Sequence, residues 1–159
     1  MEYDRKKAVE YAHTWAFRRN PLFADFEGMG GDCANFVSQC LLAGGAKMNT
    51  SPVYGWYYFS LRDRSPAWSG VEQFYRFAAN NRSDGPKVTA ISAAESAPGD
   101  IVQLVTAGGR FHHSGIIVSS SDQPALENIL IACHSFDADY RPLSSYNIRQ
   151  LRFLKVLSV

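Results

Sequence analysis

The chain has 159 residues, enough for a single domain over residues 1–159 with a sizeable core, and its 46% hydrophobic and 19% charged residues exclude a disordered or coiled-coil protein. Sixteen Lys and Arg against 15 Asp and Glu leave a net charge of +1, which gives no electrostatic support to a nucleic-acid partner or to a membrane-surface role. Its three cysteines form no Cys-x-x-Cys pair, which argues against both a disulfide framework and a zinc ribbon.

The N-terminus carries charged residues where a signal peptide has an apolar stretch, and no apolar run reaches transmembrane length. We therefore expect no membrane insertion. The chain as given reads as cytoplasmic, with a domain of a longer exported protein as the alternative.

Helical patterns dominate the first half of the chain. Residues 4–18 place apolar side chains on one stripe and end before Asn20-Pro21, since a residue before proline is pushed out of the helical region. A second helix is predicted over Cys33–Ala43, with Asp32 as N-cap and two glycines at its end. A third is predicted over Val71–Asn80. Residues 46–69 are rich in aromatics and turns and predict an irregular surface excursion.

From Gly99 onward the pattern changes to β-branched and apolar stretches separated by turn residues. Residues 81–98 predict a loop. Strands are predicted at Ile101–Val105, Phe111–Ser119, Ile129–His134 and Ile148–Leu157. Helices followed by strands indicate an α+β domain with an antiparallel sheet.

Cys33 follows Gly30-Gly31-Asp32 at the start of the second predicted helix. The unpaired N–H groups and positive end of a helix stabilise a thiolate, and the glycines leave room for a carbonyl to approach the sulfur. A buried structural thiol is the alternative, since that is the usual fate of a free cysteine. Cys40 falls in the apolar face of the same helix and is expected to be an inert buried residue.

A nucleophilic cysteine needs a base, and the base needs an orienting partner. His112 and His113 are neighbours on a predicted strand and point to opposite faces, so only one of them can face Cys33, and the pattern does not decide which. His134 ends the next predicted strand. A zinc site built from the same residues lacks the usual short ligand spacings.

With these residues, the chain resembles the putative amidase domain of the papain-like cysteine hydrolases, a group akin to the CHAP domains and to bacterial cell-wall cysteine endopeptidases. The resemblance covers nearly the whole length, and its specific part is the run GGDCANFVSQ. It continues through PGDIVQL, HSGIIV and HSFDADYRPLSSY.

The resemblance implies a papain-like fold, Cys33 as nucleophile and His113 as base, because His113-Ser114-Gly115-Ile116 fits the pattern of related enzymes. It implies His134 as the third catalytic residue, with Asp137 as the rival. Papain has an oxyanion-hole glutamine six residues before its cysteine, a place taken here by Glu27.

Three further residues are predicted to bind substrate: Trp56, Tyr57 and Asp32. For the two aromatic residues, core filling is an equal alternative.

We expect a cysteine-dependent amidohydrolase or peptidase that needs no cofactor or metal and acts through an acyl-thioester on a peptide or amide, with cell-wall material as one source. One alternative is an acyl transferase of the same fold, which would pass the acyl group to an amine. Another is a non-catalytic binding module with an aromatic groove, against which the intact set of Cys33, His113 and His134 counts.

Overall fold

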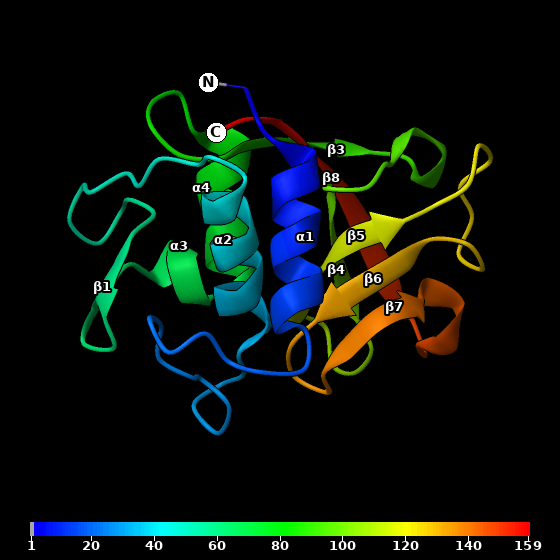
Figure 1. The fold of residues 1–159 in the computed structure, drawn as a ribbon, viewed down its shortest axis with the longest axis horizontal. Helices are drawn as coiled ribbons and strands as arrows, with labels where there is room; N and C mark the ends of the chain where they lie inside the picture. The colour runs from blue at the N-terminus through cyan, green and yellow to red at the C-terminus, as the bar shows by residue number, and fades with distance from the viewer. Residues whose placement is uncertain (1) are drawn as a thin grey trace.

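A group of helices lies against one face of an antiparallel sheet in the computed structural model, which describes residues 2–159 (Figure 1). The α+β class predicted from the sequence is confirmed. The helices are α1 (Arg5–Trp15), α2 (Cys33–Ala43), α3 (Pro66–Ser69) and α4 (Val71–Asn80), and two short 3₁₀ turns are η1 (Ala93–Glu95) and η2 (Leu143–Ser145).

The main sheet has six strands in the order β3-β8-β4-β5-β6-β7, and every neighbouring pair is antiparallel. Its strands are β3 (Lys87–Ile91), β4 (Ile101–Val105), β5 (His113–Ser119), β6 (Leu130–Cys133), β7 (Ala138–Pro142) and β8 (Gln150–Ser158). A small hairpin of β1 (Tyr58–Ser60) and β2 (Asp63–Arg64) lies apart from it.

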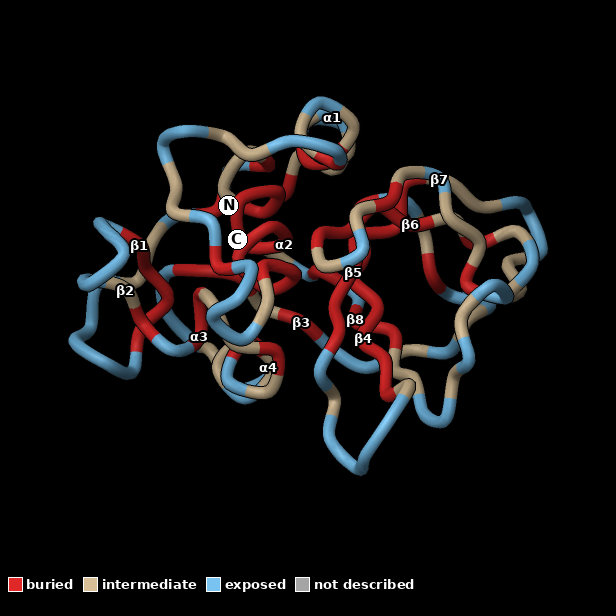
Figure 2. The backbone as a smooth tube through the Cα atoms, turned by 90° about the horizontal axis from the view of Figure 1, so that it is seen from below, coloured by how far each residue is buried: buried red, intermediate tan, exposed pale blue. Residues whose placement is uncertain are grey.

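Helix α2 runs through the centre of the molecule, and Figure 2 shows it red over most of its length. Every residue from Cys33 to Leu41 is buried, because α1 and β5 flank the helix and α3 closes it from another side. Burial on all sides requires partners for its polar residues. Asn35 donates to the carbonyl oxygen of Ala24 at 2.9 Å, and Tyr11 donates to Gln39 at 2.6 Å.

Two buried tryptophans attach the neighbouring segments to α2. The indole of Trp56 donates to Ser38 at 3.1 Å, and that of Trp68 donates to Asn35 at 2.8 Å, while the two rings lie 4.7 Å apart. Trp56 is fully buried, and the hydroxyl of Tyr57 accepts from the backbone of Val53. Both aromatic residues predicted to bind substrate therefore fill the core, which is the alternative that the sequence left open.

The sheet carries a hydrophobic cluster on each face. Ile101, Ile116 and Leu154 point toward the helices, whereas Val102, Ile117 and Phe153 belong to a second cluster on the opposite face, which loop residues such as Leu126 and Ile148 cover. The two chain ends lie close together (Figure 1). Within residues 2–159, none of the helices has the length and apolar character needed to cross a membrane.

The predicted helix boundaries agree closely with the structure, since α2 and α4 begin and end at the predicted residues and α1 ends three residues early. The four predicted strands correspond to β4, β5, β6 and β8. Strands β3 and β7 were missed because both lie at a sheet edge, where polar and half-exposed residues break the apolar alternation. The short α3 and the β1–β2 hairpin were also missed, inside the segment predicted to be irregular.

Candidate active site

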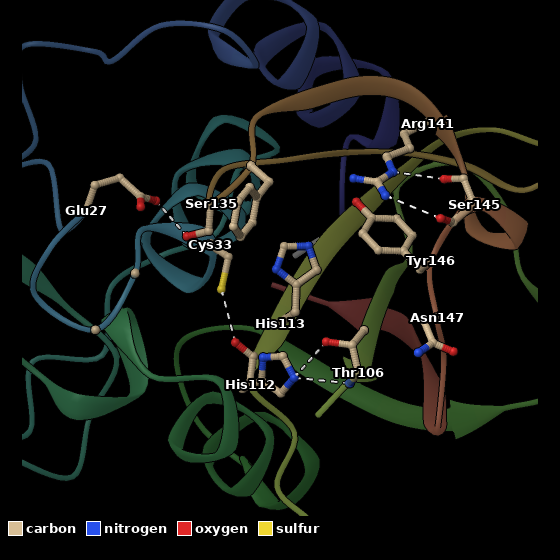
Figure 3. Close-up of a pocket in the computed structure, with 13 residues that line it drawn as sticks. Glu27, Cys33, Thr106, His112, His113, Ser135, Arg141, Ser145, Tyr146 and Asn147 are labelled. Atoms are coloured by element: carbon tan, nitrogen blue, oxygen red, sulfur yellow. Dashed lines mark hydrogen bonds between the residues drawn. The ribbon is translucent and has the colours of Figure 1, made fainter. Parts of the chain in front are cut away.

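Cys33 is the first residue of α2 and lies on the wall of a pocket of about 590 Å³ (Figure 3). The chain reaches it through Gly30 and Gly31, whose φ angles of 99° and 104° are in the left-handed region. A side chain at Gly31 would also meet the hydroxyl of Ser135 at 3.1 Å. The double glycine is thus required by the turn that precedes the helix.

The sulfur of Cys33 is held as a thiol in the free protein. Burial raises its pKa to about 11, although the backbone N–H groups of Ser114 and Ala34 act in the opposite direction. The S–H donates to the carbonyl oxygen of His112 at 3.7 Å, a contact that a thiolate cannot make. The thiolate expected from the helix terminus is therefore not the resting form, because desolvation outweighs the helix end.

The ring of His113 lies between the sulfur of Cys33 and the ring of Tyr146, with which its centroid distance is 5.7 Å (Figure 3). Its Nε2 is buried and has no hydrogen-bond partner in the described part of the chain. Burial lowers the pKa of His113 to about 4, and the charges of His112 and Arg141 act in the same direction. His113 is thus neutral and able to accept a proton at neutral pH.

His112 takes a different place, as expected for neighbours on a strand. Its ring turns toward Thr106, whose backbone N–H donates to Nε2 at 3.1 Å (Figure 3). What it presents to Cys33 is its backbone oxygen.

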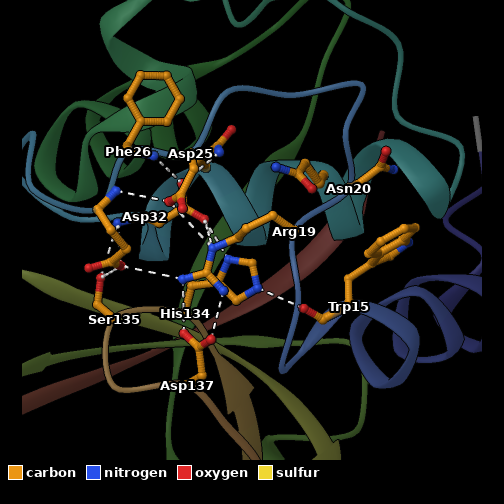
Figure 4. A network of polar contacts seen from close by, with 12 residues as sticks. Trp15, Arg19, Asn20, Asp25, Phe26, Asp32, His134, Ser135 and Asp137 are labelled. Atoms are coloured by element: carbon orange, nitrogen blue, oxygen red, sulfur yellow. Dashed lines mark hydrogen bonds and ion pairs between the residues drawn. The ribbon is translucent and has the colours of Figure 1, made fainter.

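His134 does not orient His113, because both of its ring nitrogens have other partners (Figure 4). Nδ1 lies 2.5 Å from Oδ2 of Asp32, and Nε2 lies 2.7 Å from the carbonyl oxygen of Trp15. A carbonyl oxygen only accepts, so Nε2 carries a proton, and a second proton lies between Nδ1 and the carboxylate. The pairing with His113 expected from the resemblance is thereby replaced by a buried pair with Asp32.

Asp137, the rival third residue, is also engaged elsewhere. It accepts two hydrogen bonds from Arg19, at 2.6 and 3.1 Å. The same guanidinium lies 3.3 Å from Asp25, 3.6 Å from Asp32 and 3.9 Å from Glu27, and the hydrogen bond to Asp137 is the largest cause of the raised pKa of Arg19. We call Arg19, its four carboxylates and His134 the Arg19 cluster (Figure 4).

Asp32 occupies the predicted N-cap position, but its side chain makes no capping hydrogen bond. It is 1% exposed, and its Oδ1 accepts from the backbone of Phe26 at 2.8 Å and from Asn35 at 2.8 Å. It therefore does not contact the pocket as a substrate-binding residue would. Because the Asp32 side chain turns away from the helix, it accepts no hydrogen bond from the first N–H groups of α2.

The hairpin turn between β6 and β7 closes one side of the pocket. Its central residues, Ser135 and Phe136, both have φ of 61°, as a two-residue type I′ turn requires. Ser135 accepts from the backbone of Asp32 at 3.0 Å and donates to Glu27 at 2.6 Å. Phe136 is 90% exposed at the pocket rim, and a bulky residue in this backbone conformation is strained.

The rest of the pocket wall carries no motif that would identify it from the sequence. Its further lining residues come from the position after β4, from β7 and from the segment after β7, and they are Thr106, Arg141, Ser145, Tyr146 and Asn147. A second hollow of about 250 Å³ adjoins Cys33 on the side of Val71 and Phe111, so the sulfur lies where two hollows meet. Across residues 2–159, no three His, Cys, Asp or Glu side chains are grouped so as to hold a metal ion.

Comparison with known proteins shows the family to which the chain belongs. It is 35% identical over 121 residues to the uncharacterized protein YhbB of Bacillus subtilis (strain 168), a match that covers 75% of this chain and 38% of that protein. The chain thus spans well under half the length of this relative. No solved structure matches. The family model described as "Putative amidase domain" matches residues 2–156, and the chain belongs to this family.

Proposed function

We propose that this amidase-family domain is a cysteine-dependent amidohydrolase in which Cys33 is the nucleophile and His113 the base. The observation that carries the proposal is the position of the His113 ring beside the Cys33 sulfur, at a helix start that opens into a pocket (Figure 3). A strand that packs on α2 carries the base, so sheet and helix together set the relative position of the two groups. We propose a papain-like relation for this arrangement as well.

The first step moves a proton from sulfur to imidazole. The thiol leaves the carbonyl oxygen of His112, to which it donates at 3.7 Å, and His113 takes its proton. The thiolate then attacks the carbonyl carbon of the amide and forms a carbon–sulfur bond. Since the free pair is neutral, we expect proton transfer to accompany substrate binding and attack.

The later steps use the same groups. Free N–H groups at the start of α2 stabilise the oxyanion. They are available because the carboxylate of Asp32 does not cap the helix and instead contacts His134. Protonated His113 gives its proton to the departing amine as the carbon–nitrogen bond breaks, leaving a thioester. His113 then takes a proton from water, whose oxygen attacks the thioester. The carbon–sulfur bond breaks and His113 returns the proton to the sulfur, so the products are a carboxylic acid and the free thiol.

His134 and Asp137 have a positioning role in this proposal. Through Asp32 and Arg19 they hold the segment that leads into Cys33, and neither lies within hydrogen-bond distance of His113. The catalytic unit is thus a Cys–His pair, and the buried Nε2 of His113 keeps no protein acceptor among the described residues. The substrate class is a peptide or related amide, with cell-wall peptides among those to be tested.

The test is a search for the acyl-enzyme. The protein is incubated with a panel of N-acyl amino acid amides, short peptides and soluble cell-wall peptides, and intact-mass spectrometry follows any adduct. We expect an adduct that hydroxylamine releases, that Cys33→Ala abolishes and that the matched variant Cys133→Ala retains.

Water labelled with ¹⁸O distinguishes hydrolysis from transfer, because only hydrolysis places the label in the released acid. Full turnover by Cys33→Ala would contradict the proposal. Product that forms only when an amine is added would identify an acyl transferase instead.

A further inference from the structure

The pocket wall beyond His113 ends at the guanidinium group of Arg141, which the proposed mechanism does not use. Its Nε donates to the hydroxyl of Ser145 at 2.8 Å, and its Nη2 lies 3.4 Å from the carbonyl oxygen of the same residue. Its Cζ stands 3.7 Å from the centre of the Tyr146 ring. These contacts fix the plane of the guanidinium before any ligand arrives, which reduces the entropy lost on binding.

The positive charge of Arg141 has no carboxylate within 4.0 Å anywhere in residues 2–159, whereas Arg5, Arg19 and Arg152 each have one at 2.7 Å or less. Nη1 makes no hydrogen bond to a described residue. Figure 3 shows it turned away from Ser145, toward the side of the pocket on which His113 lies. A fixed guanidinium with a free edge is suited to a planar anion.

The opposite end of the pocket does not offer a comparable free charge. Glu27 lines it, but its carboxylate already accepts from Ser135 at 2.6 Å and from the backbone of Asp32 at 3.1 Å, and it lies 3.9 Å from Arg19. The unpaired charge of the pocket is therefore positive and lies at Arg141.

We propose that Arg141 binds a carboxylate group of the substrate, so that the amide cleaved at Cys33 belongs to an acidic peptide or an amino acid derivative with its carboxylate over Tyr146. This inference rests on the proposed function, since it places the carboxylate relative to an amide bound at Cys33.

A carboxylate at Arg141 would also affect the base. The charges that face His113 are those of His112 and Arg141, and both lower its pKa. An anion that pairs with the guanidinium offsets part of this effect, so protonation of His113 becomes easier when the substrate is bound. A substrate with a carboxylate thus assists the proton transfer from Cys33, and the same substrate with a neutral amide in its place does not.

The experiment uses alkylating probes that differ only in this group. N-iodoacetyl derivatives of glycine, β-alanine and γ-aminobutyric acid are compared with their primary amides, and the rate of labelling at Cys33 is measured by peptide mass spectrometry. The ratio of the acid rate to the amide rate cancels differences in thiolate fraction within each variant. For one spacer length we expect a ratio of about 10 to 100, the range that a charge-assisted hydrogen bond gives.

Arg141→Gln should bring the ratio close to one, and Arg141→Lys should retain part of it, because lysine keeps the charge but not the planar edge. The control is Arg149→Gln, which removes one positive charge from an exposed position outside the pocket and should keep the wild-type ratio.

A ratio near one for all spacers, or one that survives Arg141→Gln, overturns this inference alone. Labelling that spares Cys33 while Cys40 or Cys133 reacts contradicts the proposed function, and the inference with it.

Discussion

Two polar groups flank the start of α2 and differ in how completely their members are paired. In the Arg19 cluster, the guanidinium faces four carboxylates, and both nitrogens of His134 have partners. The buried Nε of Arg19 makes no hydrogen bond to a described residue, but its charge is compensated by Asp25 at 3.3 Å and Asp32 at 3.6 Å. In the pocket, by contrast, His113 keeps a buried nitrogen without a partner, and Arg141 has no carboxylate near it within the described residues.

This difference suggests that the Arg19 cluster stabilises the fold and that the pocket carries the proposed reaction. Buried polar groups are normally paired, since each unpaired one costs free energy, so a paired cluster is what stability alone would produce. An unpaired histidine beside a thiol is what stability would remove. His113, which begins β5, and His134, which follows β6, are therefore expected to have different roles. His113 should act in the reaction and His134 in stability, and the following substitutions test this distinction.

The largest expected effect is on turnover when the unpaired histidine is lost. His113→Gln should lower the rate of amide cleavage by about 10³-fold, the scale of a general base. The matched variant His112→Gln, which alters only the ring bonded to Thr106, should stay within about tenfold of wild type. The measurement is kcat/KM on any substrate found in the panel. Equal losses in both variants would remove the distinction between the two neighbours.

Loss of the paired histidine should act on stability instead. His134→Asn removes the partner of a buried carboxylate, and breaking such a pair costs about 4 kcal/mol of the free energy of unfolding. Urea denaturation measures this cost, and turnover is then compared per folded molecule. A variant that keeps its stability but loses its turnover would restore His134 to the catalytic group.

The depressed pKa of His113 predicts acid sensitivity of the fold. Because the pKa is about 4 in the folded state and about 6.5 in an unfolded chain, only the unfolded state gains a proton between these values. The stability contribution is complete above pH 6.5 and falls by about 3 kcal/mol as the pH drops to 4. The free energy of unfolding, measured against pH, should fall for wild type by about 3 kcal/mol more than for His113→Gln over this range. An equal pH dependence in the two proteins would show that His113 is not buried as a neutral group.

The smallest effect is expected at Asp137. Its ion pair with Arg19 is partly exposed, with side-chain exposures of 25% and 27%, and three other carboxylates remain near the guanidinium. Asp137→Asn should therefore cost about 1 kcal/mol and leave the pH dependence of turnover unchanged. An altered acid limb in the pH profile would show that Asp137 acts on His113 after all.

Local patterns were sufficient to predict the part of the site that depends on one segment. The double glycine, the N-cap position and the apolar run define α2 and the place of Cys33, while the choice of His113 came from the resemblance and not from strand periodicity. The third residue could not be predicted, because β5 and β6 pair with a register shift and His134 lies beyond the end of β6. Register between strands depends on contacts that no single segment encodes.

Arg19 shows the same limit. It precedes a proline loop and carries no motif, yet it joins carboxylates from the loop before Cys33 and from the turn after β6. Trp56 and Tyr57 failed for a different reason. An aromatic run in an irregular segment fits a cleft as well as a core. The indole contact with Ser38 places Trp56 in the core, and the burial of Tyr57 places it beside Trp56.

The hydrogen bond between Ser135 and Asp32 joins positions 103 residues apart, which has a consequence during synthesis. At about 5 to 20 residues per second, a ribosome needs on the order of 5 to 20 s to make the intervening chain. Through all of that interval the nascent helix carries its thiol without the hairpin, and through most of it without His113. If the proposed function holds, the domain is inactive until the last third of the chain has emerged from the ribosome and folded onto the first third.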